Sequence, residues 1–260
     1  MPELPDVEIF RQEAEKAAGQ AIESVDINDS DFLDTSQATF NKYLSGNKLK
    51  DTFRRGKYLF LFTENKHAVV MHFGMTGYLK YAARNKDAPG YAKCSFNLEN
   101  DHRLYYVSKR KLGQVELTDD LENFLIEHEL GPDALEINKE DFMNALKKSR
   151  SMVKSFITDQ SVIAGIGNVY ADEILFQSRI YPKQPSDEIT EAQGREIYDQ
   201  MRSVLKTAIK KHAEVSKLPD SFLLPRRREG EKCPVCKGKV KKIRISGRTG
   251  YYCPDCQGKK

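Results

Sequence analysis

The sequence predicts an α+β fold in two lobes: an antiparallel β-sandwich or barrel with flanking helices, followed by a helical part that ends in a cysteine ribbon. Three observations support this prediction. Short segments rich in β-branched and aromatic residues fill the first half, apolar residues recur at helical spacing in the second half, and four cysteines stand in two close pairs near the end. The predicted domains are residues 1–118, 119–225 and 226–260.

The first element is a helix predicted for PELPDVEIFRQEAEKAAG, with Gly19 as its stop signal. Proline fits the first turn of a helix because its missing N–H would have no partner there, and acids complement the helix dipole at that end. One interpretation of Pro2 and Glu3 is therefore only that they start a helix well.

Seven short segments, many of them alternating, are predicted to be strands of an antiparallel sandwich or barrel. They are AIESVDI (21–27), KLKDTFRR (48–55), KYLFLFT (57–63), AVVMHFGM (68–75), GYLKYAA (77–83), AKCSFNL (92–98) and RLYYVSK (103–109). A capped segment, SQATFNKYLSG, predicts a helix between the first two strands.

From Asp119 onward the period becomes helical, with apolar residues at three- and four-residue steps. Helices are predicted within 121–130, 139–149, 153–159, 168–178 and 192–215. Residues 216–231 lose this period and contain two prolines and an arginine triplet, so they are predicted to be a linker. After it, KVKKIRISGRTGYYC predicts two strands joined at Ser246-Gly247.

The charge of the chain is unevenly distributed. The net charge is +4, yet residues 226–260 hold twelve Lys and Arg against three acids. A basic module on an acidic body favours a polyanion as partner, because cations gain affinity by releasing counterions from phosphates. The alternative is a solvated basic tail.

The same module holds four of the five cysteines, as CPVC, sixteen residues and CPDC. This spacing of Cys233, Cys236, Cys253 and Cys256 is typical of a ribbon that binds one structural Zn²⁺, and a pair of disulfides is the alternative. Four thiolates leave no open position for a reactive water, so the metal is not expected to take part in catalysis. Cys94 is predicted to be a small buried residue.

The sequence contains no apolar run of membrane-spanning length and no secretory signal at its start. We therefore expect an intracellular protein, cytoplasmic or associated with the nucleoid.

Five motifs in order, MPELPDVE, RRGKYLF, MHFGMTGYL, GIGNVYADEILF and the CPDCQ ending, resemble the formamidopyrimidine-DNA glycosylase and endonuclease VIII family of base-excision repair enzymes. The resemblance covers essentially the whole chain. It implies an N-terminal β-sandwich, a helix-two-turns-helix domain and a C-terminal zinc finger. It also implies a monomeric bifunctional DNA glycosylase and abasic-site lyase that acts on damaged, double-stranded DNA.

The resemblance implies catalytic roles for three residues. Once Met1 is removed, the secondary amine of Pro2 would attack C1′ of the damaged nucleotide, and Glu3 would be the acid and base. Lys57 would contact a phosphate at the lesion, although a lysine at a strand edge is usually a solubilising residue. Asp6, where many relatives have glutamate, and Glu8 would support Glu3 or simply complement the helix dipole.

Other residues are implied to bind DNA. Asn168 and Arg248 would bind the backbone around the lesion, Asn168 at a helix start whose amides suit a phosphate. The simpler role for Asn168 is a helix cap, and the two roles are compatible. Met75, Arg110 and Leu112 would fill the gap left by an everted nucleotide. Met75 and Leu112 could otherwise belong to the core.

The sequence departs from the family pattern in two places. SKRKLG (108–113) stands where members that excise 8-oxoguanine have an aspartate-proline-arginine-arginine-phenylalanine-glycine motif, and the lid before the ribbon is short. The preferred lesion therefore stays open, as does β- against β/δ-elimination. Two alternatives are a lyase or specialised glycosylase for bulky or crosslinked lesions, and a catalytically silent binder of damaged DNA.

Overall fold

The computed structural model describes residues 1–29, 33 and 35–258, which form two compact units. The first unit consists of Met1–Pro2 and Asp6–His128, and the second of Glu3–Pro5 and Glu129–Lys260. The sequence places a boundary after Thr118, whereas the first unit extends to His128 and includes helix α3 (Leu121–Glu127). The helices that follow residue 129 and the cysteine ribbon belong to the second unit.

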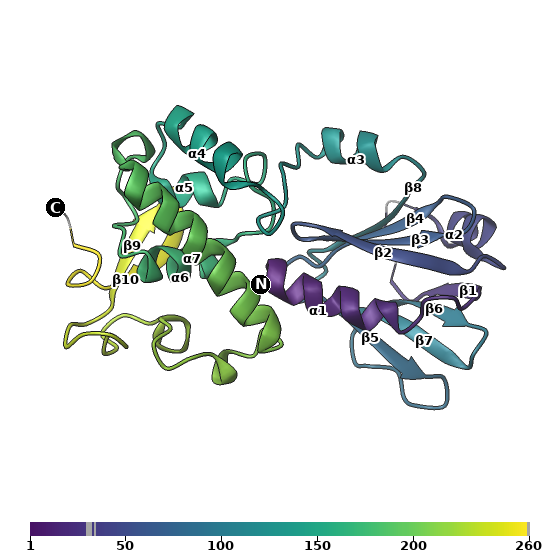
Figure 1. Cartoon of the computed structure of the whole chain (residues 1–260). Coiled ribbons are helices and arrows are strands. Elements are labelled where there is room, and N and C mark those ends of the chain that lie inside the picture. The colour runs from purple at the N-terminus through teal and green to yellow at the C-terminus, as the bar shows by residue number, and fades with distance from the viewer. Residues whose placement is uncertain (30–32, 34, 259–260) are drawn as a thin grey trace. The chain divides into compact units, whose positions relative to one another are not determined.

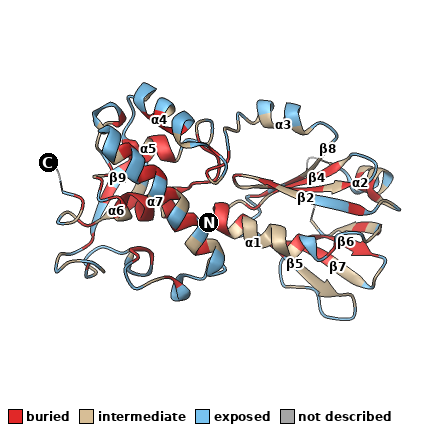
Figure 2. Ribbon diagram, in the orientation of Figure 1, coloured by how far each residue is buried: buried red, intermediate tan, exposed pale blue. Residues whose placement is uncertain are grey.

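The first unit contains the antiparallel β-sandwich, as expected from the sequence (Figure 1). One sheet has the order β1-β6-β7-β5 and the other β2-β3-β4-β8. Apolar side chains of both sheets share one core, which accounts for the buried strand segments in Figure 2. The bounds are β1 Ile22–Ile27, β2 Leu49–Arg55, β3 Tyr58–Thr63, β4 Ala68–His72, β5 Tyr78–Ala83, β6 Ala92–Leu98, β7 His102–Val107 and β8 Gln114–Thr118. Strand β8 was not predicted.

Helix α1 (Leu4–Glu15) begins later than the sequence suggests. Pro5 occupies its first turn, so Pro2 and Glu3 precede the helix, and the helix-start interpretation of Pro2 is wrong. The chain turns after Glu15 and reaches a left-handed conformation at Gly19, with φ of 79°. The predicted helix between β1 and β2 is α2 (Gln37–Leu44), whose first turn is capped by Ser36.

The second unit is built on four α-helices that share an apolar core, α4 (Lys139–Lys148), α5 (Val153–Ile157), α6 (Asn168–Gln177) and α7 (Glu191–Lys210). The short helices η1 (Ser186–Glu188), η2 (Val215–Lys217) and η3 (Leu224–Arg226) connect them to one another and to the ribbon. Leu218, Phe222 and Leu224 of the predicted linker are buried in the same core. The linker is therefore packed against the helices along much of its length.

The ribbon contains the predicted hairpin, β9 (Lys241–Ile245) and β10 (Arg248–Tyr252). Ser246 and Gly247 form its two-residue turn, both with positive φ, as in the type I′ turns that match the twist of paired strands. Among the described helices, none is long and apolar enough to cross a membrane.

Candidate functional site

The N-terminus of α6 is capped by a residue far away in the sequence. The carboxylate of Glu3 is fully buried, and it accepts hydrogen bonds from the backbone N–H groups of Gly167 (2.8 Å), Val169 (2.8 Å) and Tyr170 (3.1 Å). A carboxylate suits this place because it satisfies N–H groups that have no partner within the helix and complements the positive end of the helix dipole. Glu3 is thereby held by three donors.

Two glycines before α6 make room for this contact. A Cβ at Gly167 would lie 2.4 Å from the carboxyl carbon of Glu3, and a Cβ at Gly165 would lie 2.6 Å from the Leu4 side chain. These glycines permit the close approach of the 3–5 segment to the loop. The amides that the sequence suggested for a DNA phosphate are thus occupied by Glu3, which corrects that part of the prediction.

Pro2 lies just before Glu3 and is partly exposed, while Met1 is 54% exposed.

Further along α1, Glu8 accepts hydrogen bonds from Arg54 Nε (3.0 Å) and Arg11 Nη2 (2.8 Å). Burial alone would raise the pKa of Glu8, but the hydrogen bonds and charges of both arginines lower it. Glu8 is therefore a charged anchor between α1 and β2.

Lys57 lies in the turn between β2 and β3, directly after Gly56. Arg54 donates from Nη1 to the carbonyl of Gly56 (3.2 Å), so the guanidinium that binds Glu8 also fixes this turn. His72, which the sequence analysis overlooked, pairs in register with Tyr58, the residue after Lys57. Burial, then the charge of Lys57 and of His128, lower the pKa of His72 to about 4.

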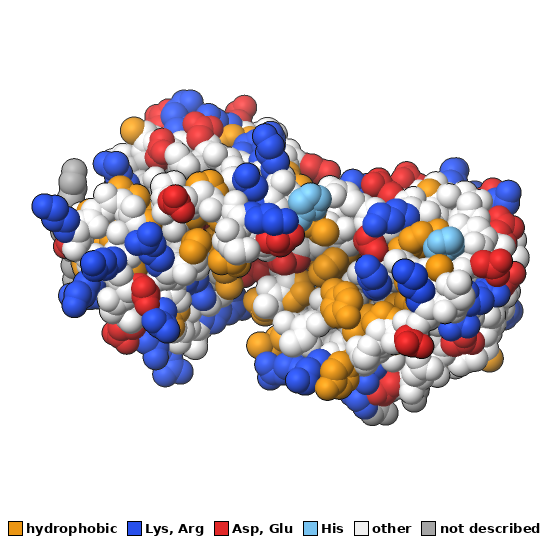
Figure 3. Space-filling model, turned by 90° about the horizontal axis from the view of Figure 1, so that it is seen from below, with side chains coloured by type: hydrophobic (Ala, Val, Ile, Leu, Met, Phe, Trp, Pro, Cys, Tyr) orange, Lys and Arg blue, Asp and Glu red, His pale blue; other side chains and the backbone are white. Residues whose placement is uncertain are grey.

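Met75, Arg110 and Leu112 lie on two loops that touch. The backbone N–H of Arg110 donates to Thr76 Oγ1 (3.2 Å), and a Cβ at Gly74 would lie 2.3 Å from the carbonyl oxygen of Leu112. Met75 is 41% and Leu112 51% exposed, so the alternative that they are core residues is wrong. Figure 3 shows a face of the first unit on which hydrophobic side chains adjoin Lys and Arg side chains.

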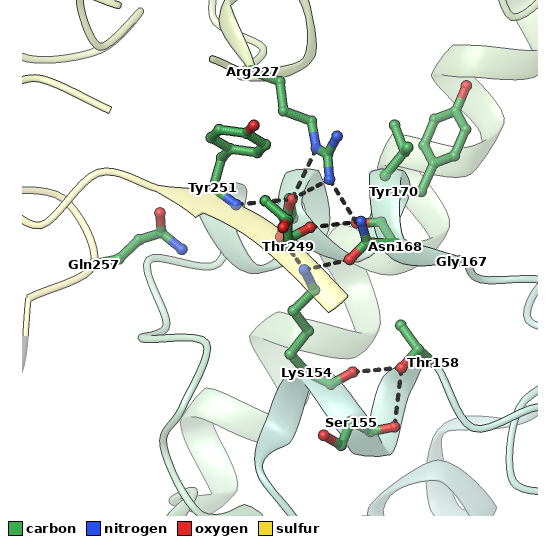
Figure 4. Close-up of polar contacts among 12 residues, drawn as sticks. Lys154, Ser155, Thr158, Gly167, Asn168, Tyr170, Arg227, Thr249, Tyr251 and Gln257 are labelled. Carbon is green, nitrogen blue, oxygen red and sulfur yellow. Dashed lines mark hydrogen bonds and ion pairs between the residues drawn. The ribbon is translucent and has the colours of Figure 1, made fainter. Parts of the chain in front are cut away.

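Asn168 and Arg248 line one cavity of about 350 Å³ in the second unit, together with Lys154 and the loop after α5. The Asn168 side chain donates to the carbonyl of Thr249 (2.7 Å) and accepts from Lys154 Nζ (2.8 Å), as Figure 4 shows. Gly167 is the N-cap of α6, and Asn168 is the first helical residue, so Asn168 is not its helix cap. The structure thus brings the two predicted backbone-binding residues together.

The four ribbon cysteines converge, with all four Sγ atoms within 4.8 Å of one another. Sγ atoms of Cys233 and Cys256 are 3.7 Å apart, and those of Cys236 and Cys253 are 3.5 Å apart. A tetrahedral Zn²⁺ with bonds of about 2.3 Å requires sulfur atoms about 3.8 Å apart. The residues present therefore fit one structural zinc.

Comparison with known sequences decides the family. The profile of the formamidopyrimidine-DNA glycosylase N-terminal domain matches residues 1–115. The profile of the formamidopyrimidine-DNA glycosylase H2TH domain matches residues 130–220. The profile of a zinc finger found in FPG and IleRS matches residues 230–258. The formamidopyrimidine-DNA glycosylases of Lactococcus lactis and Streptococcus pneumoniae are 31% and 32% identical over 99–100% of each chain. The chain belongs to the formamidopyrimidine-DNA glycosylase family.

Solved structures of this family agree. A Lactococcus lactis Fpg complex with Fapy-dG-containing DNA matches with a TM-score of 0.89 at 28% identity, covering 99% of this chain and 100% of that one. A complex of the same enzyme with DNA containing an abasic site matches with a TM-score of 0.87. The predicted family, fold class and structural zinc are confirmed. The chain is a base-excision-repair DNA glycosylase, in a family in which abasic-site lyase activity is typical.

Proposed function

We propose that this Fpg-family chain excises damaged bases from double-stranded DNA through a covalent intermediate on Pro2 and then cleaves the strand. The observation that carries the proposal is the position of Glu3, which is buried, held by three backbone donors and adjacent in the chain to the candidate nucleophile. An acid or base held in one place can transfer a proton to O4′, which is bonded to the carbon that Pro2 attacks.

The chemistry follows from the secondary amine of Pro2. Its nitrogen lone pair forms a bond to C1′, and the base leaves with the electrons of the glycosidic bond and takes up the proton that the Pro2 nitrogen gives up. The C1′–O4′ bond then breaks, O4′ receives a proton from Glu3, and an iminium forms. The iminium acidifies C2′, so loss of a C2′ proton expels the 3′ phosphate, and a second elimination can release the 5′ phosphate. Water finally hydrolyses the iminium.

Both units must contact the DNA for this reaction. Lys57, fixed by the Arg54 contact to Gly56, supplies a cation for a phosphate at the lesion, and Asn168 and Arg248 bind the backbone from one cavity. The exposed side chains of Met75, Arg110 and Leu112 fill the space of the everted nucleotide. One chain carries all of these groups, so a monomer suffices.

Formamidopyrimidine lesions are the proposed substrate class, because the relatives carry this activity in their names. A second candidate substrate is a bulky or crosslinked lesion, or an abasic site. On this alternative the enzyme would have little activity on 8-oxoguanine. The buried side chains of Leu218, Phe222 and Leu224 favour it, because the segment before the ribbon packs against the helices. A segment held in that way is not free to fold over a flipped base. We place the protein inside the cell, at the nucleoid, where this substrate is found.

A panel of duplexes, each with one defined lesion, tests the proposal. The substrate assignment predicts that formamidopyrimidine duplexes are cut fastest and that Glu3→Gln abolishes base release. Cleavage confined to bulky or abasic substrates would establish the second candidate. Tight binding without any cleaved product would show that the chain is a silent binder of damaged DNA and would overturn the enzymatic proposal.

A further inference from the structure

The arginine triplet Arg226-Arg227-Arg228 before the ribbon is not explained by the roles above. Its three members differ in the structure. Arg226 and Arg228 are exposed, and Arg228 pairs with Glu231 at the surface. Arg227 is only partly exposed, and its side chain donates to Asp172 of α6, 55 residues earlier in the chain. Figure 4 shows Arg227 among the polar contacts of this cluster.

Asp172 is completely buried and binds groups from three other segments. Its Oδ1 accepts a hydrogen bond from Lys154 Nζ of α5 (2.6 Å). Its Oδ2 accepts from Arg227 Nε (2.8 Å) and from the backbone N–H of Tyr251 in β10 (3.0 Å). The guanidinium of Arg227 also lies over the Tyr251 ring, 5.0 Å from its centroid. The carboxylate therefore joins α5, α6, the linker and the hairpin.

This cluster leads directly to the cavity that holds Asn168 and Arg248. Lys154 binds both Asp172 and the Asn168 side-chain oxygen, and the Asn168 amide nitrogen donates to Thr249, the residue after Arg248. The hairpin approaches closely because Gly250 has no side chain: a Cβ there would lie 2.4 Å from Lys154 Nζ and 2.9 Å from Asp172 Oδ1. The fixed position of Asn168 and Arg248 thus depends on the same buried carboxylate.

Two cations pair with this carboxylate. Burial raises the pKa of Asp172, and the charges of Lys154 and Arg227 oppose that shift. Burial likewise lowers the pKa of Lys154, and the charge of Asp172 opposes that shift.

The hairpin of β9 and β10 depends on this cluster for its orientation. A two-stranded hairpin has little stability of its own, so its orientation relies on such contacts and on the metal.

We propose that Arg227 is a positioning residue of the phosphate-binding cavity, which acts through Asp172 to hold Asn168 and the Arg248 hairpin in their binding geometry. This inference deepens the proposed function, since it concerns how the same DNA is held. Arg227 does not line the cavity itself. Its effect on DNA binding is therefore indirect, unlike that of an exposed arginine in the same triplet.

The triplet supplies matched controls, because each of Arg226→Ala, Arg227→Ala and Arg228→Ala removes one positive charge from the same segment. Binding is measured against a duplex that carries a tetrahydrofuran abasic analogue, over a series of salt concentrations. We expect Arg227→Ala to weaken binding about tenfold more than either control. Arg227→Lys keeps the charge but loses the planar guanidinium and its stacking, so its affinity for the duplex should lie between that of the wild type and that of Arg227→Ala. Equal losses for all three alanine variants would overturn the proposal.

A double-mutant cycle separates positioning from a direct or merely structural role. In a background that carries Asn168→Ala and Arg248→Ala, Arg227→Ala should have almost no further effect on affinity, because the groups that it positions are gone. A full additional loss in that background would contradict the proposal. Zinc content and melting temperature are measured in parallel, and if Arg227→Ala does not fold, Arg227→Lys takes its place in the cycle. The test is independent of Pro2 chemistry: catalysis retained by Pro2→Gly together with an intact cycle would refute the nucleophile assignment and leave the role of Arg227 standing.

Discussion

The two units present their functional groups in opposite ways. In the first unit, Met75, Arg110 and Leu112 lie exposed on loops that leave an apolar sandwich, and the core beneath them is ordinary hydrophobic packing. In the second unit, Glu3 and Asp172 are fully buried, and their backbone and cationic partners define the site. Substitutions in the first unit should therefore change function with little loss of stability, whereas in the second unit function and stability should fall together.

Removal of the metal should give the largest loss of stability and of DNA binding, and the loss of structure should be confined to the second unit. Cys253→Ser removes one of four ligands, and zinc binding contributes roughly 10 kcal/mol to the folding of small zinc fingers. We expect loss of zinc by elemental analysis, unfolding of the ribbon, and DNA binding weakened about a hundredfold because Arg248 is no longer held. Cys94→Ala, which alters a buried thiol of the first unit, is the control and should keep one zinc per chain.

Gly167→Ala should give the next largest effect. The new methyl group would displace Glu3 and leave its backbone donors without a partner, so we expect a loss of about 3 kcal/mol in the free energy of unfolding. Base release should be lost as well. Gly90→Ala is the matched control because a Cβ there meets nothing within 4 Å. A stable Gly167→Ala variant with normal activity would refute the role given to Glu3.

His72 sharpens the comparison, since it is a partly buried titratable group in the first unit. Its pKa of about 4 in the folded state lies below the ordinary value of 6.5, so the unfolded chain binds the proton more readily between these values. The contribution of neutral His72 to the free energy of unfolding should be fully present above pH 6.5 and should decrease as the pH drops toward 4, by about 2 kcal/mol at pH 5. Denaturant titrations give the free energy of unfolding of the wild type and of His72→Gln, and the difference between the two proteins should change by that amount from pH 7 to pH 5. A difference that stays constant between the two pH values would contradict an imidazole that is partly buried and neutral.

Leu112→Ala should have the smallest effect on stability, below about 0.5 kcal/mol, because the side chain is half exposed. Base excision from a duplex should nevertheless slow about tenfold, since the gap left by the everted nucleotide is filled less well. Excision of the same lesion from a single strand should be unaffected. Ile126→Ala, an exposed apolar residue of α3, is the control and should change neither rate.

The same contrast explains what could be predicted from the sequence. The zinc site, the Ser246-Gly247 turn and strands β1 to β7 of the sandwich are encoded locally, by ligand spacing, turn conformation and alternation, and the structure contains them. Short motifs were also enough to predict Met75, Arg110 and Leu112, and these motifs lie on adjacent loops.

The buried network could not be predicted in this way. Asp172 and Arg227 look like any surface acid and any member of a basic run, and only the fold brings them together across 55 residues. Glu3 was selected for chemistry, yet its contact with the α6 amides depends on a loop more than 160 residues away. His72 was missed because its relation to Lys57 depends on the register between β3 and β4.

The most direct test of the account is the position of the covalent bond. Borohydride is added to the mature protein and a duplex with an abasic site, and the trapped adduct is digested and mapped by mass spectrometry. The account predicts one sugar fragment on the nitrogen of an N-terminal Pro2, and no adduct when a tag left upstream blocks that nitrogen. An adduct on a lysine, or full trapping with the N-terminus blocked, would contradict it.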